Sequence, residues 1–349
     1  MTPSSSLQAR LGIARPILQA PMAGAQGSDL AIAVAKAGGL GALPGAMLTP
    51  DAMAAEISAF RAASAAPLNV NFFCHTPPEP DPGAEARWRG ALAPYYAELG
   101  LTLDAVPEGA GRRPFDAEAC AALEPWRPEV VSFHFGLPDA VLLERVKAWG
   151  AMVLSTATTV EEACWLESHG ADAVIVQGLE AGGHRGMFLT EELTTQVGTF
   201  ALLPQVREAV ALPLIAAGGI ADARGVSAAL ALGAEAVQVG TALLCCSETM
   251  ISAIHRRALQ SEAARHTALT NLYSGRPARG IVTRLMRELG PISEAAPAFP
   301  LASTAVAPLR AAAEASGSGD FSPLWAGQNA SRCREVPAAE VIAELAAGV

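Results

Sequence analysis

The chain has 349 residues, 51% of them hydrophobic and 17% charged, which is enough to bury a large core. The formal net charge is −10 and no run of basic residues occurs, which argues against nucleic acid or an acidic membrane surface as a partner. The first ten residues lack the apolar segment of a signal peptide, and no later stretch stays apolar long enough to cross a bilayer. We therefore expect a cytoplasmic protein; its oligomeric state is left open.

The cysteines and lysines of the sequence limit the reactions that the protein is expected to catalyse. The six cysteines show no CxxC spacing, so we expect reduced thiols, and the adjacent Cys245 and Cys246 are expected to be buried and structural. The only lysines, Lys36 and Lys147, lie in alanine-rich segments typical of outer helices. No lysine is therefore expected at a strand end, which argues against Schiff-base chemistry.

The first two-thirds of the chain alternate between short apolar runs and alanine-rich segments, the pattern of repeated βα units. Ser28 is a candidate cap for a helix that ends at Gly38 and Gly39, and Asp222 for one that runs to Gly233. Eight units favour a closed (β/α)8 TIM barrel over an open sheet. The predicted strands are 16–21, 39–44, 68–73, 130–135, 151–156, 173–178, 213–218 and 236–240.

Two regions interrupt this rhythm. Residues 74–128 are rich in proline, glycine and arginine and form a long insertion after the third strand. No strand is predicted beyond residue 247, where the pattern becomes mainly helical, and a last helix is expected over 338–346. We predict a barrel over residues 1–73 and 129–246, a substrate-covering region over 74–128 and 247–330, and a terminal helical part over 331–349 that packs back on the barrel.

Three predicted strands end in amides, Asn71, Gln177 and Gln238. The carboxyl ends of barrel strands face the active site, so these side chains are expected on one rim. An amide offers both a donor and an acceptor, which suits the mixed edge of a flavin ring, although a buried amide bound to backbone is a common alternative.

Glycine-rich loops follow the seventh and eighth strands, AAGGIAD at 216–222 and QVGTALL at 238–244. Gly218, Gly219 and Gly240 would let backbone N–H groups approach an anion, and each loop is expected to open into a helix whose positive end favours phosphate. The alternative is that these glycines only cap helices or allow packing. Neither GxGxxG between a strand and a helix nor GxxxxGK[ST] occurs, which disfavours a Rossmann fold and a P-loop.

The segment QGLEAGGHRG at 177–186 carries His184 between glycines. A histidine is suited to accept a carbon-bound proton, and the alternative is a loop histidine bonded to a carbonyl. Glu180 is a weaker candidate, because it could simply fix the loop. His134 in VVSFHFG shares a strand face with Ser132 and could point into the barrel mouth. The remaining histidines lack metal-ligand spacing, so no metal is predicted.

Several segments together resemble the nitronate monooxygenase family, formerly called 2-nitropropane dioxygenases, in its bacterial class I form. The glycine-histidine loop is also similar to that of flavin-dependent enoyl-acyl-carrier-protein reductases, and the FHFGLP segment and the C-terminal matches separate the two. The matching segments are PILQAPMAG (16–24), NFF (71–73), FHFGLP (133–138), QGLEAGGHRG (177–186), AAGGI (216–220), VQVGTALL (237–244), SGRPARG (274–280) and PLWAGQ (323–328).

The resemblance implies an FMN cofactor, with His184 as the catalytic histidine and His134 as a second histidine beside the substrate. In such enzymes a nitronate passes an electron to the flavin and O2 completes the oxidation, giving an aldehyde or oxo acid with nitrite or nitrate. No nicotinamide is needed, and the implied role is detoxification of propionate 3-nitronate. The implied FMN contacts are Ala20, Pro21, Met22, Asn71, Gln177, Gly182, Gly183, Gly218, Gly219, Gln238, Val239, Gly240 and Thr241.

Two alternatives stay open. One is an NAD(P)H-dependent flavin reductase of quinones or enoyl thioesters, and the other is a flavin-binding protein without turnover. With only Tyr95, Tyr96 and Tyr273 as tyrosines, the family's substrate-contacting aromatics do not map onto the chain.

Overall fold

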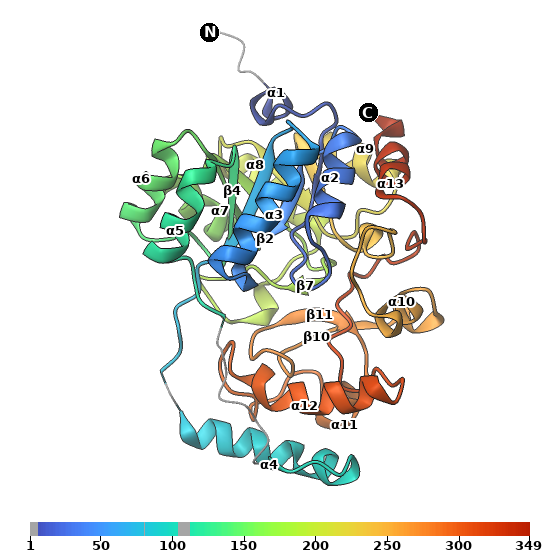
Figure 1. The fold of residues 1–349 in the computed structure, drawn as a ribbon. Helices are drawn as coiled ribbons and strands as arrows, with labels where there is room; N and C mark the ends of the chain where they lie inside the picture. The colour runs from blue at the N-terminus through green and yellow to red at the C-terminus, as the bar shows by residue number, and fades with distance from the viewer. Residues whose placement is uncertain (1–5, 80, 104–111) are drawn as a thin grey trace.

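Eight parallel strands form the centre of the computed structural model, which describes residues 6–79, 81–103 and 112–349 (Figure 1). Their order around the sheet is β1-β9-β8-β6-β5-β4-β3-β2. The predicted (β/α)8 barrel is confirmed, and each strand lies within two residues of its predicted bounds. The strands are β1 (Ile17–Gln19), β2 (Gly41–Pro44), β3 (Leu68–Phe73), β4 (Val130–His134), β5 (Met152–Ala157), β6 (Ala173–Gln177), β8 (Leu214–Ala217) and β9 (Ala236–Val239).

The barrel closes between β1 and β2, where a side chain continues the hydrogen-bond ladder. A single parallel bridge joins Leu18 to Leu40. Beyond it, the Gln19 side chain accepts from Ala42 N at 3.2 Å and donates to Ala42 O at 3.2 Å. The Gln19 side chain is fully buried, so no water is available to these backbone groups. Its amide takes the place of the strand partner that Ala42 lacks on this side.

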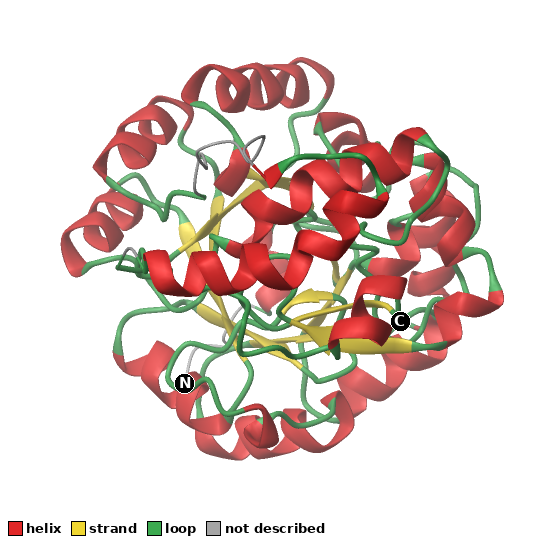
Figure 2. Cartoon of the chain, turned by 90° about the horizontal axis from the view of Figure 1, so that it is seen from below, coloured by secondary structure: helices red, strands yellow, loops and turns green. Residues whose placement is uncertain are grey.

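Helices surround the strands, as the view along the barrel in Figure 2 shows. The expectation that Ser28 caps the first of them is wrong: Gly27 is the N-cap, and Ser28 N instead donates to the Glu56 carboxylate at 2.5 Å. Asp222 does cap its helix, accepting from Gly225 N at 3.0 Å. The surrounding helices are α2 (Ser28–Lys36), α3 (Pro50–Ala63), α5 (Ala117–Leu123), α6 (Ala140–Ala148), α7 (Val160–Ser168), α8 (Thr199–Ala209), α9 (Ala223–Ala231) and α13 (Ala338–Leu345).

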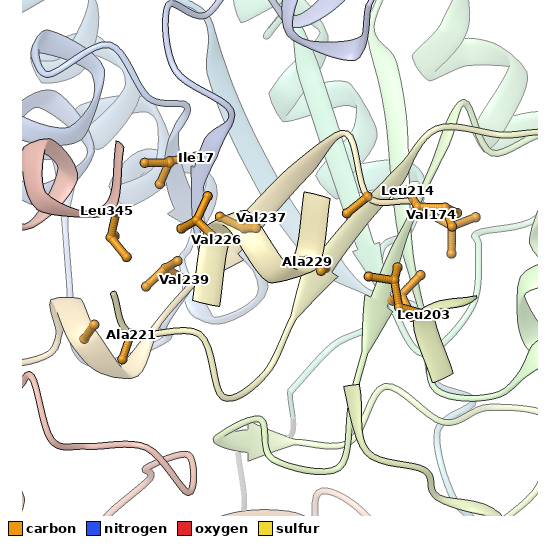
Figure 3. Packing of buried hydrophobic residues seen from close by; sticks show 14 of the residues in the cluster. Ile17, Val174, Leu203, Leu214, Ala221, Val226, Ala229, Val237, Val239 and Leu345 are labelled. Atoms are coloured by element: carbon orange, nitrogen blue, oxygen red, sulfur yellow. The ribbon is translucent and has the colours of Figure 1, made fainter. Parts of the chain in front are cut away.

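Apolar side chains fill the space between strands and helices (Figure 3). Val174, Leu214 and Val237 point outward from the strands into one buried cluster, which also contains Leu203 of α8, Val226 of α9 and Leu345 of α13. A separate cluster fills the barrel interior, where Leu7 and Leu11 of the short helix α1 (Leu7–Leu11) close the end opposite the carboxyl ends of the strands. The open end of the barrel is therefore the end that carries the predicted site.

A second layer lies across that open end (Figure 1). It contains a three-stranded antiparallel sheet in the order β10-β11-β7, so the expectation that no strand follows residue 247 is wrong. These strands are two to four residues long and lack an apolar run, which is why their sequence did not indicate them. The layer comprises α4 (Pro82–Glu98), β7 (Gly183–His184), α10 (Ala253–Leu259), β10 (Thr267–Thr270), β11 (Ala278–Ile281), α11 (Arg284–Leu289) and α12 (Ala302–Ala315).

The insertion contributes to both layers. Trp88 and Tyr96 of α4 donate to the carbonyls of Ala302 and Ala305 in α12, at 3.1 and 2.7 Å. At its other end, α5 packs between α3 and α6 in the helical ring. The division of the chain into a barrel, a covering region and a terminal part stays a prediction.

Two further features concern the chain as a whole. All six cysteines are free, and Cys245 and Cys246 are fully buried beside a turn rather than within a helix. No helix in the described ranges combines the length and the apolarity needed to cross a membrane.

Candidate active site

A pocket opens at the carboxyl ends of the barrel strands, beneath the second layer. It encloses roughly 1380 Å³ between its atoms, including solvent at its mouth. Of the predicted site residues, the pocket brings together the following: Ala20, Pro21, Met22, Asn71, His134, Gln177, Gly182, Gly183, His184, Gly218, Gly219, Gln238, Gly240 and Thr241.

Val239 is the one predicted contact that does not line the pocket. Its side chain is 1% exposed and packs outside the barrel wall, in the cluster that contains Val237. Its carbonyl is also occupied, because it accepts from Ala20 N at 2.9 Å. The alternation of side chains along β9 explains this, since Gln238 faces inward and its two neighbours face outward.

The backbone around His184 is held in place by glycines. Gly183 has a φ of +70°, and a Cβ on Gly182 would lie 2.5 Å from Gly327 N, so neither position readily takes a side chain. His184 pairs with Ala278 of β11, which ties the loop to the second layer. The glycines thus allow two backbones to cross at the pocket wall.

The His184 ring is oriented by Ser274. Nε2 lies 2.8 Å from Ser274 Oγ, and the serine hydroxyl donates to Arg276 O at 3.2 Å. The hydrogen bond between Ser274 Oγ and His184 Nε2 therefore fixes the plane of the ring.

Two predicted site residues converge on the carbonyl of His184. Gln177 Nε2 donates to it at 3.0 Å and His134 Nε2 at 3.1 Å, while Gln177 Oε1 accepts from Gly186 N at 2.8 Å. His134 Nδ1 lies 3.1 Å from Thr156 Oγ1 and accepts from that hydroxyl. The sequence suggested as an alternative that His184 is bonded to a carbonyl, and in the structure His134 makes such a bond. The Gln177 amide holds the loop that carries His184.

Buried charges fix the rest of this loop. Arg185 is fully buried and donates to the carbonyls of Gln177 and Gly178, at 2.8 and 2.6 Å. Glu180 accepts from Thr199 N and Thr199 Oγ1, both at 2.8 Å, so it anchors the loop as its weaker candidacy suggested. These contacts make the loop a rigid support for His184.

Burial keeps the site histidines neutral. It is the largest cause that lowers the pKa of His134 to about 4, and the pKa of His75 to about 4. The pKa of His184 is also lowered well below its usual value, first by burial and then by the charge of Arg112. At neutral pH all three rings are therefore uncharged.

Glycines and a helix start form the opposite side of the pocket. Gly218 and Gly219 have φ values of +119° and +74°, and α9 begins four residues later at Ala223. Gly240 leads into a single 3-10 turn, Thr241–Leu243, so the expectation that both loops open into helices holds only for the first. Asn329 of the C-terminal part closes this side, donating to Gly219 O at 3.0 Å.

Comparison with known proteins places this site in a family. The family model described as nitronate monooxygenase matches residues 4–348. The chain belongs to the nitronate monooxygenase family. The resemblance predicted from the motifs is confirmed, as is the expectation of an oxidoreductase.

Individual relatives agree. Proteins named nitronate monooxygenase from Paraburkholderia phytofirmans and Pseudomonas aeruginosa are each 43% identical, over 96% of this chain and 92% and 96% of their own lengths. Among solved structures, nitroalkane oxidase from Streptomyces ansochromogenes has a TM-score of 0.88 at 42% identity, covering 96% of this chain and 95% of its own. FabK from Thermotoga maritima has a TM-score of 0.72 at 28% identity, covering 98% and 95%.

The family implies a flavin, and the pocket fits one. The buried Gln238 Oε1 has no hydrogen-bond partner among the described residues, so an acceptor faces the space that a flavin ring would fill. Gly218 and Gly219 line the pocket in a turn ahead of α9, an arrangement that suits binding of a phosphate by backbone N–H groups.

Sequence reasoning missed several residues in and around the pocket. Phe73, Arg112 and Trp325 line it, and the rings of Phe299 and Trp325 each lie 5.5 Å from that of His184. Phe73, Ser274 and Trp325 stood inside segments noted for the family resemblance, which could have singled them out. Phe299 and Arg112 carried no local signal.

Proposed function

We propose that this chain binds FMN and uses it to oxidise alkyl nitronates with O2, propionate 3-nitronate being the expected substrate. The products are an aldehyde or oxo acid together with nitrite or nitrate. The observation that carries the proposal is a neutral, half-buried His184 facing a glycine-lined pocket in a member of this family. We also expect the protein to act in the cytoplasm, where its free cysteines would stay reduced.

The flavin would be held mainly by backbone groups. Gly218, Gly219 and Gly240 would present N–H groups to the phosphate, with the positive end of α9 adding to the attraction. Gln238 and Asn71 would bind the edge of the ring. The Asn71 side chain is held in place by a hydrogen bond from Nδ2 to Ser132 O at 3.1 Å. Val239 would contribute only through its strand.

The protein supplies contacts that position the substrate and exclude water beside the cofactor. Bound FMN would supply the one-electron and oxygen chemistry that no side chain can perform. His184 presents a neutral imidazole to the nitronate, because burial keeps the ring uncharged and Ser274 fixes its orientation. Phe73 and Phe299 keep this space apolar, which strengthens each electrostatic contact within it.

Oxygen consumption tests the proposal. The purified protein is expected to be yellow and to consume O2 with propionate 3-nitronate in the absence of NADH and NADPH. A yellow protein that is inert to every nitronate would instead indicate flavin binding without turnover. A colourless protein that refuses added FMN would overturn the proposal.

The alternative is NAD(P)H-dependent reduction of a quinone or an enoyl thioester. The structural similarity to FabK favours it, as does the loop resemblance to enoyl-acyl-carrier-protein reductases. Anaerobic mixing with NADH or NADPH separates the two functions. Rapid bleaching of the flavin by a nicotinamide, without O2 uptake on nitronates, would establish the reductase.

A further inference from the structure

The pocket carries a single formal charge. Among the described residues that line it, Arg112 is the only arginine, and no lysine, aspartate or glutamate is present. The other polar groups are amides, hydroxyls and imidazoles that burial keeps neutral. The chain as a whole carries a net charge of −10, so a pocket whose charged residue is a cation differs from the overall acidic character of the protein.

Arg112 also lacks a partner for its charge. Its Nη1 is buried without a hydrogen bond, and no carboxylate of the described residues forms an ion pair with it. The group closest to pairing with it is the Phe299 ring, whose centroid is 5.5 Å from the guanidinium carbon. The adjacent Arg113, in contrast, is paired with Asp116 at 2.5 Å and Glu118 at 2.8 Å. Since arginine stays protonated and a buried unpaired charge is costly, a guanidinium without a carboxylate among the described residues is available to bind an anion in the pocket.

The position of Arg112 separates it from the proposed phosphate site. Phe115 N donates to Phe73 O at 2.7 Å, which ties this segment to the end of β3. In the eight-stranded order, β3 is four strands from β8, the strand that precedes Gly218 and Gly219. Arg112 therefore lies across the barrel from the phosphate loops and beside His184, whose pKa its charge lowers.

We propose that Arg112 is a specificity residue that binds a two-oxygen anion of the substrate. A nitronate and a carboxylate each carry two oxygens on one planar atom, which matches the paired donors of a guanidinium. This inference rests on the proposed function and defines its substrate class as anions, in preference to neutral nitroalkanes with the same carbon skeleton. Arg112 would hold the anion while His184 faces the reacting carbon.

The test compares R112Q and R112K with R113Q, a matched control that removes a neighbouring exposed guanidinium. With propionate 3-nitronate, R112Q is expected to raise KM about ten- to hundredfold, R112K less, and R113Q not at all, because a hydrogen bond to a charged group is lost only at position 112. We expect kcat to change by less than about threefold, since the reacting groups stay in place. Ethyl nitronate, which has no carboxylate, shows which anion Arg112 binds. An equal rise in KM with both substrates places the nitronate on Arg112. A rise confined to propionate 3-nitronate places the carboxylate there.

A binding measurement avoids turnover altogether. Propionate and succinate are unreactive anions, and their titration into the FMN-loaded protein without oxygen is expected to perturb the flavin spectrum in the wild type and in R113Q but not in R112Q. Neutral propionamide should have no effect. Wild-type KM values and wild-type anion binding in R112Q would overturn the inference, as would loss of FMN from R112Q with KM unchanged. If the wild type refuses FMN, the proposed function fails, and calorimetry with succinate still tests Arg112.

Discussion

The two sides of the pocket are built in different ways. One side, here called the glycine rim, consists of Gly218, Gly219, Gly240 and Thr241 and presents backbone groups. The other, called the histidine wall, consists of His134, His184, Phe73, Trp325 and Arg112 and presents side chains. The rim comes from two adjacent strand ends, whereas the wall combines barrel strands, the insertion and the C-terminal part. Mutations and changes of pH are therefore expected to affect the two sides differently.

The largest effect is expected from the histidine wall. H184N should lower kcat by about 10² to 10⁴ while FMN stays bound, because the imidazole that faces the reacting nitronate is lost and the rim is untouched. Oxygen uptake gives the rate, and the absorbance spectrum gives the flavin content. H169N is the matched control, since His169 is exposed and stacks on Trp165 at 3.8 Å, away from the pocket. A variant with unchanged steady-state kinetics would remove His184 from the mechanism.

Low pH should destabilise the histidine wall, which contains the titratable His134, but not the glycine rim. His134 titrates at about 4 in the folded protein against roughly 6.5 when unfolded, because burial disfavours its charged form. Between these values the unfolded chain binds more protons, so the free energy of unfolding is full above about pH 6.5 and decreases as the pH falls toward 4. Denaturant unfolding at a series of pH values measures this, and the slope should decrease in H134N. An equal slope in H134N would show that His134 does not contribute to it.

A smaller effect is expected at the glycine rim. G219A places a side chain at a φ of +74°, which costs about 1–2 kcal/mol, and should weaken FMN retention beyond that strain. G150A provides the control, because Gly150 has a φ of +91°, nothing within 4 Å of the added Cβ, and no place in the pocket. Equal FMN affinity in the two variants would mean that the Gly219 backbone does not approach the cofactor.

The same contrast explains how far the sequence could be interpreted. Gly218, Gly219 and Gln238 were predictable because alternation and glycine at strand ends are local signals, and all eight barrel strands were found for this reason. Phe299 and Arg112 were not, since Arg112 reaches the pocket from the insertion and Phe299 reaches the His184 ring from the second layer, in which Trp88 and Tyr96 attach α4 to α12. The short strand at Ala278 escaped notice because pairing with His184, rather than an apolar pattern, defines it.

The smallest effect tests how finely the wall is adjusted. S274A removes the hydroxyl bonded to His184 Nε2, so the ring loses its fixed orientation and kcat should fall by about two- to tenfold, the loss of one hydrogen bond of roughly 0.5–1.5 kcal/mol. KM should stay unchanged, because Ser274 does not line the pocket. S303A is the control: it removes a half-buried hydroxyl of the second layer, which donates to Pro300 O at 2.7 Å and has no bond to a histidine. If S274A and S303A have the same kcat, the orientation of His184 comes from its glycine-flanked backbone alone, and the two sides of the pocket would differ less than their construction suggests.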